Sequence, residues 1–361
     1  MHGYQFEFNR GEAMDWLIAA PFSREASARW LGAFVPGARH RFSSVPAPYR
    51  HDRSRASTNV RGWANYFEHG WRGWAQARNS LSRLGVAAGV ITCFPQIPLS
   101  VGLRDRFSLQ HIPIVAWSFN LGELPGGIKR VASRFCLRAV DQFVVHSRGE
   151  VAACSEWLQL PEDRFRFVPL NRPVRSIELT EDHEHPFMLA LGSARRDYRL
   201  LFEAMKGLTD IRLIVVAGAH AVAGLKVPPN IEVRGGLTLE QCHTLIQRAR
   251  VSVIPIANAQ TASGQVTLID AMMFARPVVV TCCPGSLDYA QPDREVLMVP
   301  PGDVQAMREA LQRLWDDQAL RETIGQLARQ RAIHEFSDEA AGKLLGEVLD
   351  AVEAHHLSVS G

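Results

Sequence analysis

The sequence predicts an α/β protein made of two doubly wound, Rossmann-like domains. The chain has 361 residues, more than one ordinary hydrophobic core accommodates. Short apolar strand patterns alternate with helical patterns in both halves, which is typical of a parallel sheet covered by helices on both faces. A polar segment with proline near both ends, residues 171–186, separates the two series and is predicted to be a linker.

The first half is predicted to hold five strands with helices between them. The expected strands are 15–20, 89–94, 112–117, 142–147 and 164–170. Helices are expected over 130–140 and 147–157, and the aromatic residues between 63 and 74 also recur at helical spacing. The apolar stretch 85–101 contains two prolines, so we interpret it as a buried strand plus a connection and not as a membrane span.

The second half repeats the alternation. The expected strands are 187–192, 211–218, 230–235, 251–256 and 277–281, and the segment 297–303 leads into the last helices. Helices are predicted over about 197–206 and 238–248, from about 264 to the Arg-Pro at 276–277, and in long amphipathic form towards residue 361.

Composition excludes several classes of protein. A content of 47% hydrophobic and 21% charged residues is that of a soluble globular protein. The six cysteines form no Cys-x-x-Cys pair, so buried reduced thiols are expected in place of a metal framework or a disulfide scaffold. The N-terminal segment has neither a basic region nor an apolar core, so we expect no secretory signal and a cytoplasmic location.

One region is strongly basic and aromatic. From Arg24 to Arg83 there are 11 arginines and 3 acidic residues. Arginine beside tryptophan and tyrosine suits phospholipid headgroups, a polyprenyl diphosphate or nucleic acid, and peripheral contact with the inner membrane face is one hypothesis for this region. The alternative is a general preference for arginine over lysine, and no nucleic-acid partner is expected because no recognition module is present. The stripe from Trp63 to Trp74 is either core or interface, or a sugar platform.

Two loops of the second half are candidate anion sites. The strand 251–256 leads into a loop and a helix start that contain Thr261, Ser263, Gly264 and Gln265. In a parallel sheet this point lies at the ligand-binding edge, and backbone N–H groups at a helix N-terminus attract anions. One carboxylate, Asp270, follows about 9 Å along the helix axis, a separation that suits a sugar hydroxyl pair next to a diphosphate.

The strand 187–192 ends in the second candidate loop. It offers Gly192, Ser193, Arg195 and Arg196 at the start of another helix. Two guanidinium groups there could clamp a diphosphate without a metal. Gly and Ser before a helix are also common caps, and that alternative stays open for both loops.

Two further candidates are weaker. His146 lies at the end of a predicted strand and could act as an acid or base, or be a structural histidine. The run 181–185 (EDHEH) offers ligand types for a metal, but a solvated charged run is the alternative, and no metal is expected.

Several segments together resemble the retaining glycosyltransferases of the GT-B fold, family 4 in particular. They are FMLALGSARRDYRLLFEAM, NIEVRGGLTLEQCHTLIQRARVSVIPI, ASGQVTLIDAMMFARPVVVT and HEFSDEAAGKLLGEVL, with AVDQFVVHSRGEVAACSEWLQLPEDRFRFVPL upstream. The resemblance implies an acceptor domain over 1–172, a nucleotide-sugar domain over 173–335, a cleft between them, and a terminal helix, 336–361, that packs back on the first domain.

The same resemblance implies residue roles. Arg195 or Arg196 would hold the diphosphate, the backbone of 263–265 would lie near phosphate and sugar, and Asp270 would bind the ribose. Catalysis would rest on Asp270, Arg196 and His146. The acceptor side would be the loop 120–127, which could supply backbone amides and Glu123, or be a simple turn; its candidate residues are Asn120, Glu123, Gly126 and Gly127. No cofactor is implied besides the nucleotide-diphospho-sugar, and the acceptor would be a saccharide or a lipid-linked sugar.

The chain departs from the family pattern at three places. Ala262 stands where the first glutamate of the Glu-x7-Glu motif is expected, and Asp270 shortens the second. The first strand lacks the family's glycine-rich loop, and Trp117-Ser118-Phe119-Asn120 stands where a histidine usually follows a strand. Two hypotheses therefore remain: an active hexosyltransferase, or a GT-B scaffold or binding protein that has lost turnover.

Overall fold

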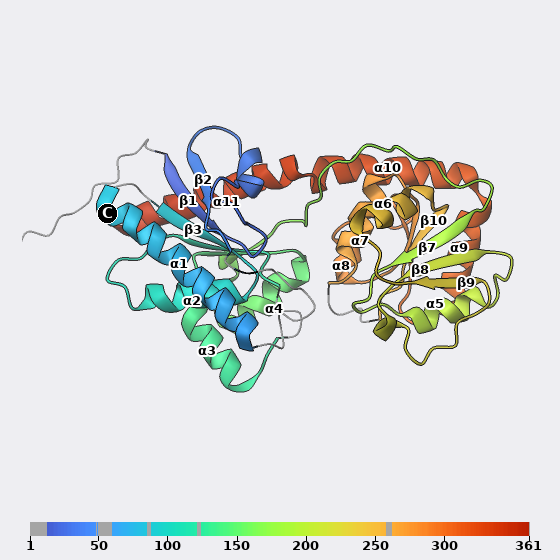
Figure 1. Cartoon of the computed structure of the whole chain (residues 1–361), viewed down its shortest axis with the longest axis horizontal. Coiled ribbons are helices and arrows are strands. Elements are labelled where there is room, and N and C mark those ends of the chain that lie inside the picture. The colour runs from blue at the N-terminus through green and yellow to red at the C-terminus, as the bar shows by residue number, and fades with distance from the viewer. Residues whose placement is uncertain are drawn as a thin grey trace, which may run out of the picture. The chain divides into compact units, whose positions relative to one another are not determined.

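The computed structural model describes residues 13–47, 49, 60–84, 88–120, 124–257 and 262–360. The chain divides into two compact units, one formed by 1–168 together with 341–361 and the other by 169–340 (Figure 1). We call them the N-terminal unit and the C-terminal unit. None of the helices in the described ranges is long and apolar enough to cross a membrane.

The N-terminal unit contains a six-stranded sheet in which all neighbouring strands are parallel. Its strands in spatial order are β2 (His40–Ser44), β1 (Met14–Ala19), β3 (Ala88–Cys93), β4 (Ile114–Trp117), β5 (Gln142–Val145) and β6 (Phe165–Phe167). Its helices are η1 (Trp30–Phe34), α1 (Val60–Leu84), α2 (Gln96–Arg106), α3 (Gly127–Leu137), α4 (Arg148–Leu158), η2 (Glu162–Arg164) and α11 (Asp338–Ser360).

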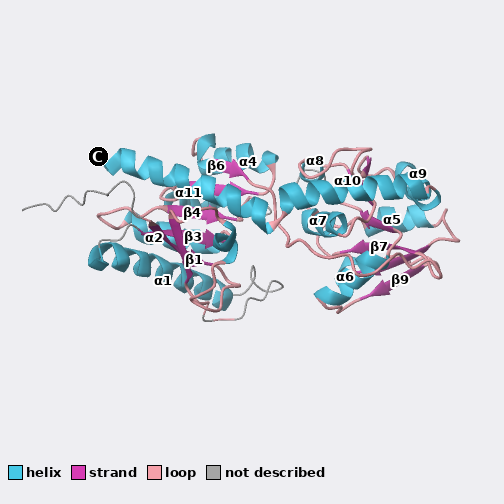
Figure 2. Ribbon diagram, turned by 90° about the horizontal axis from the view of Figure 1, so that it is seen from above, coloured by secondary structure: helices cyan, strands magenta, loops and turns pink. Residues whose placement is uncertain are grey.

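Helices cover both faces of this sheet because successive strand residues point to opposite sides. Leu17, Val90 and Phe143 pack in one core with buried residues of α1, α2, α3 and α4. Trp16 and Ile91 belong to the opposite core, together with residues of η1 and α11. The last helix of the chain thus completes the first sheet's core, and Figure 2 shows α11 and α1 on different sides of the strands.

The structure corrects two expectations in this unit. The residues after β3 form helix α2, where we expected a connection. Pro98 lies in the first turn of α2, where a missing N–H costs no intrahelical hydrogen bond, so it does not exclude a helix. Strand β2 was not expected either, because its sequence, HRFSS, is mostly polar.

The C-terminal unit contains a second six-stranded parallel sheet. Its strands in spatial order are β12 (Leu297–Val299), β11 (Val278–Thr281), β10 (Val251–Ile254), β7 (Phe187–Leu191), β8 (Arg212–Val216) and β9 (Ile231–Arg234). Its helices are α5 (Tyr198–Met205), η3 (Ala219–Ala221), α6 (Leu239–Arg248), α7 (Gln265–Met273), α8 (Pro284–Leu287), α9 (Val304–Asp316) and α10 (Gln318–Phe336).

The second sheet is also covered on both faces. Met188 and Val253 share one core with buried residues of α5 and α9. Leu189 and Ile254 share the other with residues of α6, α7 and α10. The prediction of two doubly wound α/β domains is therefore confirmed.

The segment 171–186 has no regular secondary structure, but hydrogen bonds hold it against the C-terminal unit. The backbone N–H groups of Glu178 and Leu179 donate to Gln247 at 2.7 and 3.1 Å, and Arg250 donates to Glu181 at 2.5 Å. The expected linker is thus packed along its own unit. Its Glu181 carboxylate is engaged by arginine, which disfavours the metal interpretation of the run 181–185.

Candidate functional site

The order of strands in the second sheet places a binding edge between β7 and β10. The chain proceeds from β7 through β8 to β9 on one side, then returns to β10 and continues through β11 to β12 on the other side. In open parallel sheets, ligands bind at such a switch point, beyond the carboxyl ends of the two central strands. The loops that leave β7 and β10 are the two candidate anion loops.

The loop after β7 is held in a fixed shape. Gly192 has a φ of +109°, a conformation that glycine adopts without strain. Its carbonyl accepts a hydrogen bond from the Tyr198 hydroxyl at 2.5 Å. The Asp197 side chain caps α5 by accepting from the Leu200 N–H at 2.9 Å. The N–H of Ala257, after β10, donates to the Arg195 carbonyl at 3.0 Å, so the two loops are joined through their backbones.

The Arg196 side chain joins the two loops a second time. Its guanidinium donates to the Leu191 and Ala194 carbonyls at 3.2 and 3.0 Å. It also donates to the Ser263 hydroxyl at 3.3 Å and to the Thr267 hydroxyl at 3.2 Å, both at the start of α7. Burial lowers the pKa of Arg196, yet no described carboxylate lies within ion-pair distance of it. An uncompensated cation is thereby fixed at the binding edge.

Arg195 differs from its neighbour in the contacts of its side chain. It adopts a left-handed conformation, with φ +55°, and within the described part of the chain its guanidinium makes no hydrogen bond or ion pair. Ser193 is engaged, because its hydroxyl accepts from the Gly218 N–H at 2.7 Å. Arg196 therefore braces the loops, while Arg195 keeps its donors available for a ligand.

The start of α7 depends on Gly264. This residue is the N-cap with a φ of +85°, and a Cβ atom there would lie 2.9 Å from the Ile254 side chain and 3.8 Å from the Arg196 guanidinium. The predicted proximity of the two loops is thus present in the structure. Gln265 is buried at the first helical position. Thr261 lies outside the described residues.

Asp270 is buried and already paired. Its carboxylate accepts from the Arg172 Nε at 2.7 Å and the Arg172 Nη2 at 3.2 Å. The Nε2 of His243 lies 4.0 Å from this carboxylate and has no hydrogen-bond partner among the described residues. Burial lowers the pKa of His243. A ribose could use this carboxylate only by competing with Arg172, so the ribose role of Asp270 stays a prediction.

In the N-terminal unit, His146 forms a buried pair with Ser118. Its Nδ1 lies 2.7 Å from the Val168 carbonyl and must carry the proton, so Nε2 accepts from the Ser118 hydroxyl at 2.8 Å. Burial lowers the pKa of His146 to about 4, which keeps the ring neutral at physiological pH. Ser118 has a φ of +55° directly after β4. The pair can orient a hydroxyl at the carboxyl edge of the first sheet.

The other acceptor candidates surround the start of α3. Gly126 is the N-cap of this helix, and Gly127 follows with a φ of +59°. Asn120 is exposed shortly after β4, and its N–H donates to the Ser118 carbonyl at 2.9 Å. Glu123 lies outside the described residues. The role of these residues towards an acceptor stays a prediction.

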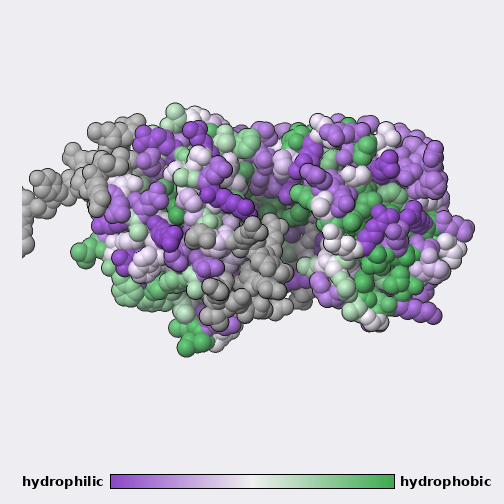
Figure 3. Space-filling model, in the orientation of Figure 1, coloured by the Kyte–Doolittle hydropathy of each residue, from purple (hydrophilic) through white to green (hydrophobic). Residues whose placement is uncertain are grey.

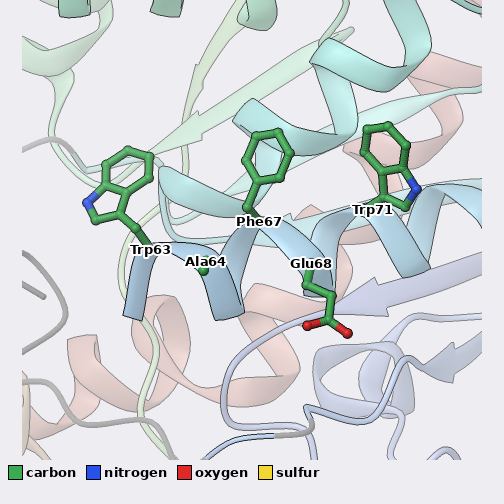
Figure 4. Close-up of a pocket in the computed structure, with 5 residues that line it drawn as sticks. All are labelled: Trp63, Ala64, Phe67, Glu68 and Trp71. Carbon is green, nitrogen blue, oxygen red and sulfur yellow. The ribbon is translucent and has the colours of Figure 1, made fainter. Parts of the chain in front are cut away.

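The tryptophan stripe on α1 divides between core and surface. Trp74 is buried and donates through its indole N–H to Asp105 at 3.0 Å. Trp63, Phe67 and Trp71 project from the same side of α1, with Glu68 on another side, and line a surface depression of 580 Å³ (Figure 4). Trp74 is therefore part of the core, and the choice between interface and sugar platform concerns the residues on the surface and is untested.

The basic region 24–83 is partly neutralised within the chain. Arg39 pairs with Glu353 at 3.1 Å, Arg41 with Asp15 at 2.6 Å, and Arg72 with Glu68 at 2.5 Å. Arg50, Arg53 and Arg55 lie outside the described residues. The described arginines of this region therefore do not form one continuous surface of unpaired positive charge.

One group has the composition of a metal site but not its chemistry. His40, Asp350 and Glu353 bring their ligand atoms close together. The Nδ1 of His40 accepts from the Trp16 indole at 3.2 Å, so its Nε2 carries the proton and donates to Asp350 at 3.1 Å. A nitrogen that carries a proton is not a metal ligand, and both carboxylates already form ion pairs with Arg39.

Three residues of these sites were not selected from the sequence. Thr267 follows Ser263 by one helical turn, so helical spacing could have indicated it. Ser118 stands where the family offers a histidine, and this departure was the available signal. No local sequence pattern indicated the ion pair of Arg172, because its partner, Asp270, is 98 positions away.

The fold and the site together define a class of protein. A glycosyltransferase from Rickettsia africae matches this chain with a TM-score of 0.66 and 13% identity, over 95% of this chain and 99% of that protein. HepE from Anabaena, in complex with UDP-glucose, matches with a TM-score of 0.62 and 10% identity, over 94% and 99%. The chain thus has the two-domain GT-B fold.

The sequence comparisons agree with this fold. Residues 186–317 match the model of the family Glycosyl transferases group 1. O-antigen chain mannosyltransferase C from Escherichia coli is 24% identical over 212 residues, which are 54% of this chain and 56% of that relative. The match therefore spans about half the length of this curated relative. The predicted resemblance to GT-B glycosyltransferases is confirmed.

Proposed function

We propose that this protein is a glycosyltransferase that moves a sugar from a nucleotide-diphospho-sugar to a saccharide or lipid-linked acceptor, with retention and without a metal. The family of residues 186–317 and the mannosyltransferase relative support the reaction class. The UDP-glucose complex of HepE supports a nucleoside-diphosphate donor. Polysaccharide or glycolipid synthesis is the corresponding role.

The observation that carries the proposal is the position of Arg196. Its guanidinium lies at the switch point of the second sheet, bonded to Ser263 and Thr267 at the N-terminus of α7. Negative charge builds on the diphosphate as the sugar leaves, and fixed donors at that point lower the barrier. Arg195 supplies a second cation beside it. Two guanidinium groups and a helix N-terminus can neutralise a diphosphate without a divalent ion, which is why we include metal independence.

Ser118 and His146 have a supporting role in the proposal. Because His146 accepts from the Ser118 hydroxyl, the oxygen of Ser118 can in turn accept a hydrogen bond from a sugar hydroxyl. With its low pKa, His146 is a weak base, so this pair orients a hydroxyl more effectively than it removes a proton. Retention is included on the strength of the family resemblance.

Titration calorimetry with UDP, GDP, ADP and the matching monophosphates tests donor binding. Arg195→Ala is expected to weaken diphosphate binding about tenfold or more, because a charge-assisted hydrogen bond is lost, and to affect monophosphates less. Arg196→Lys keeps the charge but loses the bridges to α7, so it should weaken binding as well. Arg199→Ala, at an exposed position on α5, is the matched control. If the wild-type chain binds none of these diphosphates, the proposal fails.

A second experiment separates an active enzyme from a scaffold that has lost turnover. The motivating observation is Ala262, which brings no carboxylate to the motif. Purified protein is incubated with radiolabelled nucleotide sugars, and released or transferred sugar is counted. Turnover that falls in Arg195→Ala supports the enzyme. Diphosphate binding without any turnover, including donor hydrolysis, favours the scaffold.

A further inference from the structure

Helix α3 presents an apolar row to solvent. Ile128, Val131 and Phe135 recur at helical spacing and are 85%, 64% and 45% exposed. The other side of the helix reaches the core of the N-terminal unit through Leu137. A contiguous row of large apolar side chains on the surface marks an interaction site more often than chance exposure. In Figure 3 hydrophobic residues gather along the lower edge of this unit, where α2 and α3 lie in Figure 1.

The end of α2 extends this row. The Phe107 ring is 6.2 Å from the Phe135 ring, and the Arg106 guanidinium lies 4.7 Å from the Phe135 ring centre. Phe107 is exposed, and Leu109 is fully exposed. Helix α2 packs against both α1 and α3. We call Phe107, Leu109, Ile128, Val131 and Phe135, with the basic residues that interleave them, the α3 surface.

The charged residues of α3 and its immediate flanks are of one sign. Residues 124–140 contain Lys129, Arg130, Arg134 and Arg138 and no acidic residue. Lys129, Arg130 and Arg138 are exposed, and none of them forms an ion pair within the part of the chain that the structure describes. By contrast, Arg39, Arg41 and Arg72 of the region 24–83 form ion pairs with carboxylates. Uncompensated positive charge therefore coincides with exposed apolar surface at α3.

We propose that the N-terminal unit binds an anionic lipid bilayer through the α3 surface. Apolar side chains beside lysine and arginine suit the interface, where the former enter the acyl region and the latter meet anionic headgroups. A second copy of this chain is a poorer occupant, because a symmetric contact would place like charges opposite each other. The proposal assigns membrane contact to α2 and α3 and not to the region Arg24–Arg83.

This location also concerns the acceptor loop. Residues 124–126 lead directly into α3, so a bilayer at the α3 surface would lie next to the loop that is expected to face an acceptor. The lipid binding itself does not depend on transferase activity. Vesicle binding and donor binding can therefore fail independently of each other.

Vesicle co-sedimentation tests the proposal with the full-length chain. Vesicles of phosphatidylcholine and phosphatidylglycerol in equal parts are compared with vesicles of phosphatidylcholine alone. We expect preferential binding to the anionic vesicles, weakened by salt. Ile128→Glu should reduce binding about tenfold or more, because an apolar side chain is lost and a repelling charge is gained. Lys129→Ala/Arg130→Ala should reduce it by about fivefold for each charge removed.

Leu239→Glu is the matched control, since it makes the same kind of change at an exposed helical position of the C-terminal unit. It should bind vesicles like the wild-type chain. Equal thermal unfolding temperatures of the variants establish that each is folded. The proposal is overturned if the wild-type chain ignores anionic vesicles, or if Ile128→Glu and Leu239→Glu bind alike. It is also overturned if light scattering shows a lipid-free dimer that Ile128→Glu dissociates.

Discussion

Replacing Arg172 by methionine is expected to destabilise the C-terminal unit by about 3–5 kcal/mol, because it leaves the Asp270 carboxylate buried without its partner. The two side chains are 23% and 10% exposed, and the guanidinium meets both carboxylate oxygens, at 2.7 and 3.2 Å. Opposite charges about 4 Å apart attract by about 4 kcal/mol at an effective dielectric constant near 20.

The assay is thermal and urea unfolding of Arg172→Met, Asp270→Leu and the double variant. For a unit of this size, the expected loss lowers the unfolding temperature by roughly 6–20 °C. Removing both charges should cost less than the sum of the single changes, by about 1–3 kcal/mol, since no unpaired charge remains. Arg199→Ala, at a solvent-exposed position on α5, is the control.

Two results would refute this reasoning. If Arg172→Met unfolds at the wild-type temperature, the carboxylate is hydrated without its partner and the pair contributes nothing. If the single changes are additive, the residues act independently. Calorimetry on Asp270→Asn then addresses the ligand role: loss of nucleotide binding without loss of stability would assign Asp270 to the ribose.

Three further changes test the site and the N-terminal unit. Gly264→Ala should cost about 1–3 kcal/mol of stability and weaken diphosphate binding, because the residue has a positive φ and its Cβ would meet β10; unchanged unfolding and calorimetry would show that the loop relaxes freely. Burial opposes charging of His111, but hydrogen bonds to Asp105 and Asp141 raise its pKa to about 10. The free energy of unfolding should therefore fall as the pH rises from about 6.5 to 10. A pH series of urea unfolding should show that His111→Gln removes this dependence. The pKa of His146 is lowered to about 4 by burial, so the unit should lose stability as pH falls from about 6.5 to 4, and an equal acid slope in His146→Gln would contradict this assignment.

Buried strands could be predicted from the sequence because their apolar runs are the direct consequence of being covered on two faces. FMLAL and VSVI became β7 and β10 for this reason. Strand β2 could not be predicted, since HRFSS lies at the sheet edge and is only partly buried. Helix α2 was missed because two prolines were taken as breakers, whereas one precedes the helix and the other falls in its first turn.

The meeting of Arg196 with the start of α7 could be predicted, because parallel strands deliver their following loops to one edge. The partners within the site could not. Arg172 lies 98 residues before Asp270, and nothing local to either residue indicates the pair. Likewise, the sequence does not show which of the two arginines hydrogen-bonds to the Ser263 and Thr267 hydroxyls. Arg196 does so, and Arg195 does not. That choice is made by tertiary packing.

The position of α11 has a consequence for the order in which the polypeptide becomes structured during translation. Leu345, Val348 and Leu349 fill the same core as Trp16 and Ile18. The ribosome must therefore make residues 169–340, which contain every strand of the second sheet, before the first sheet can receive its last covering helix. The half that is synthesised first is therefore completed last, and until α11 has been made one face of its strands lacks part of its apolar cover.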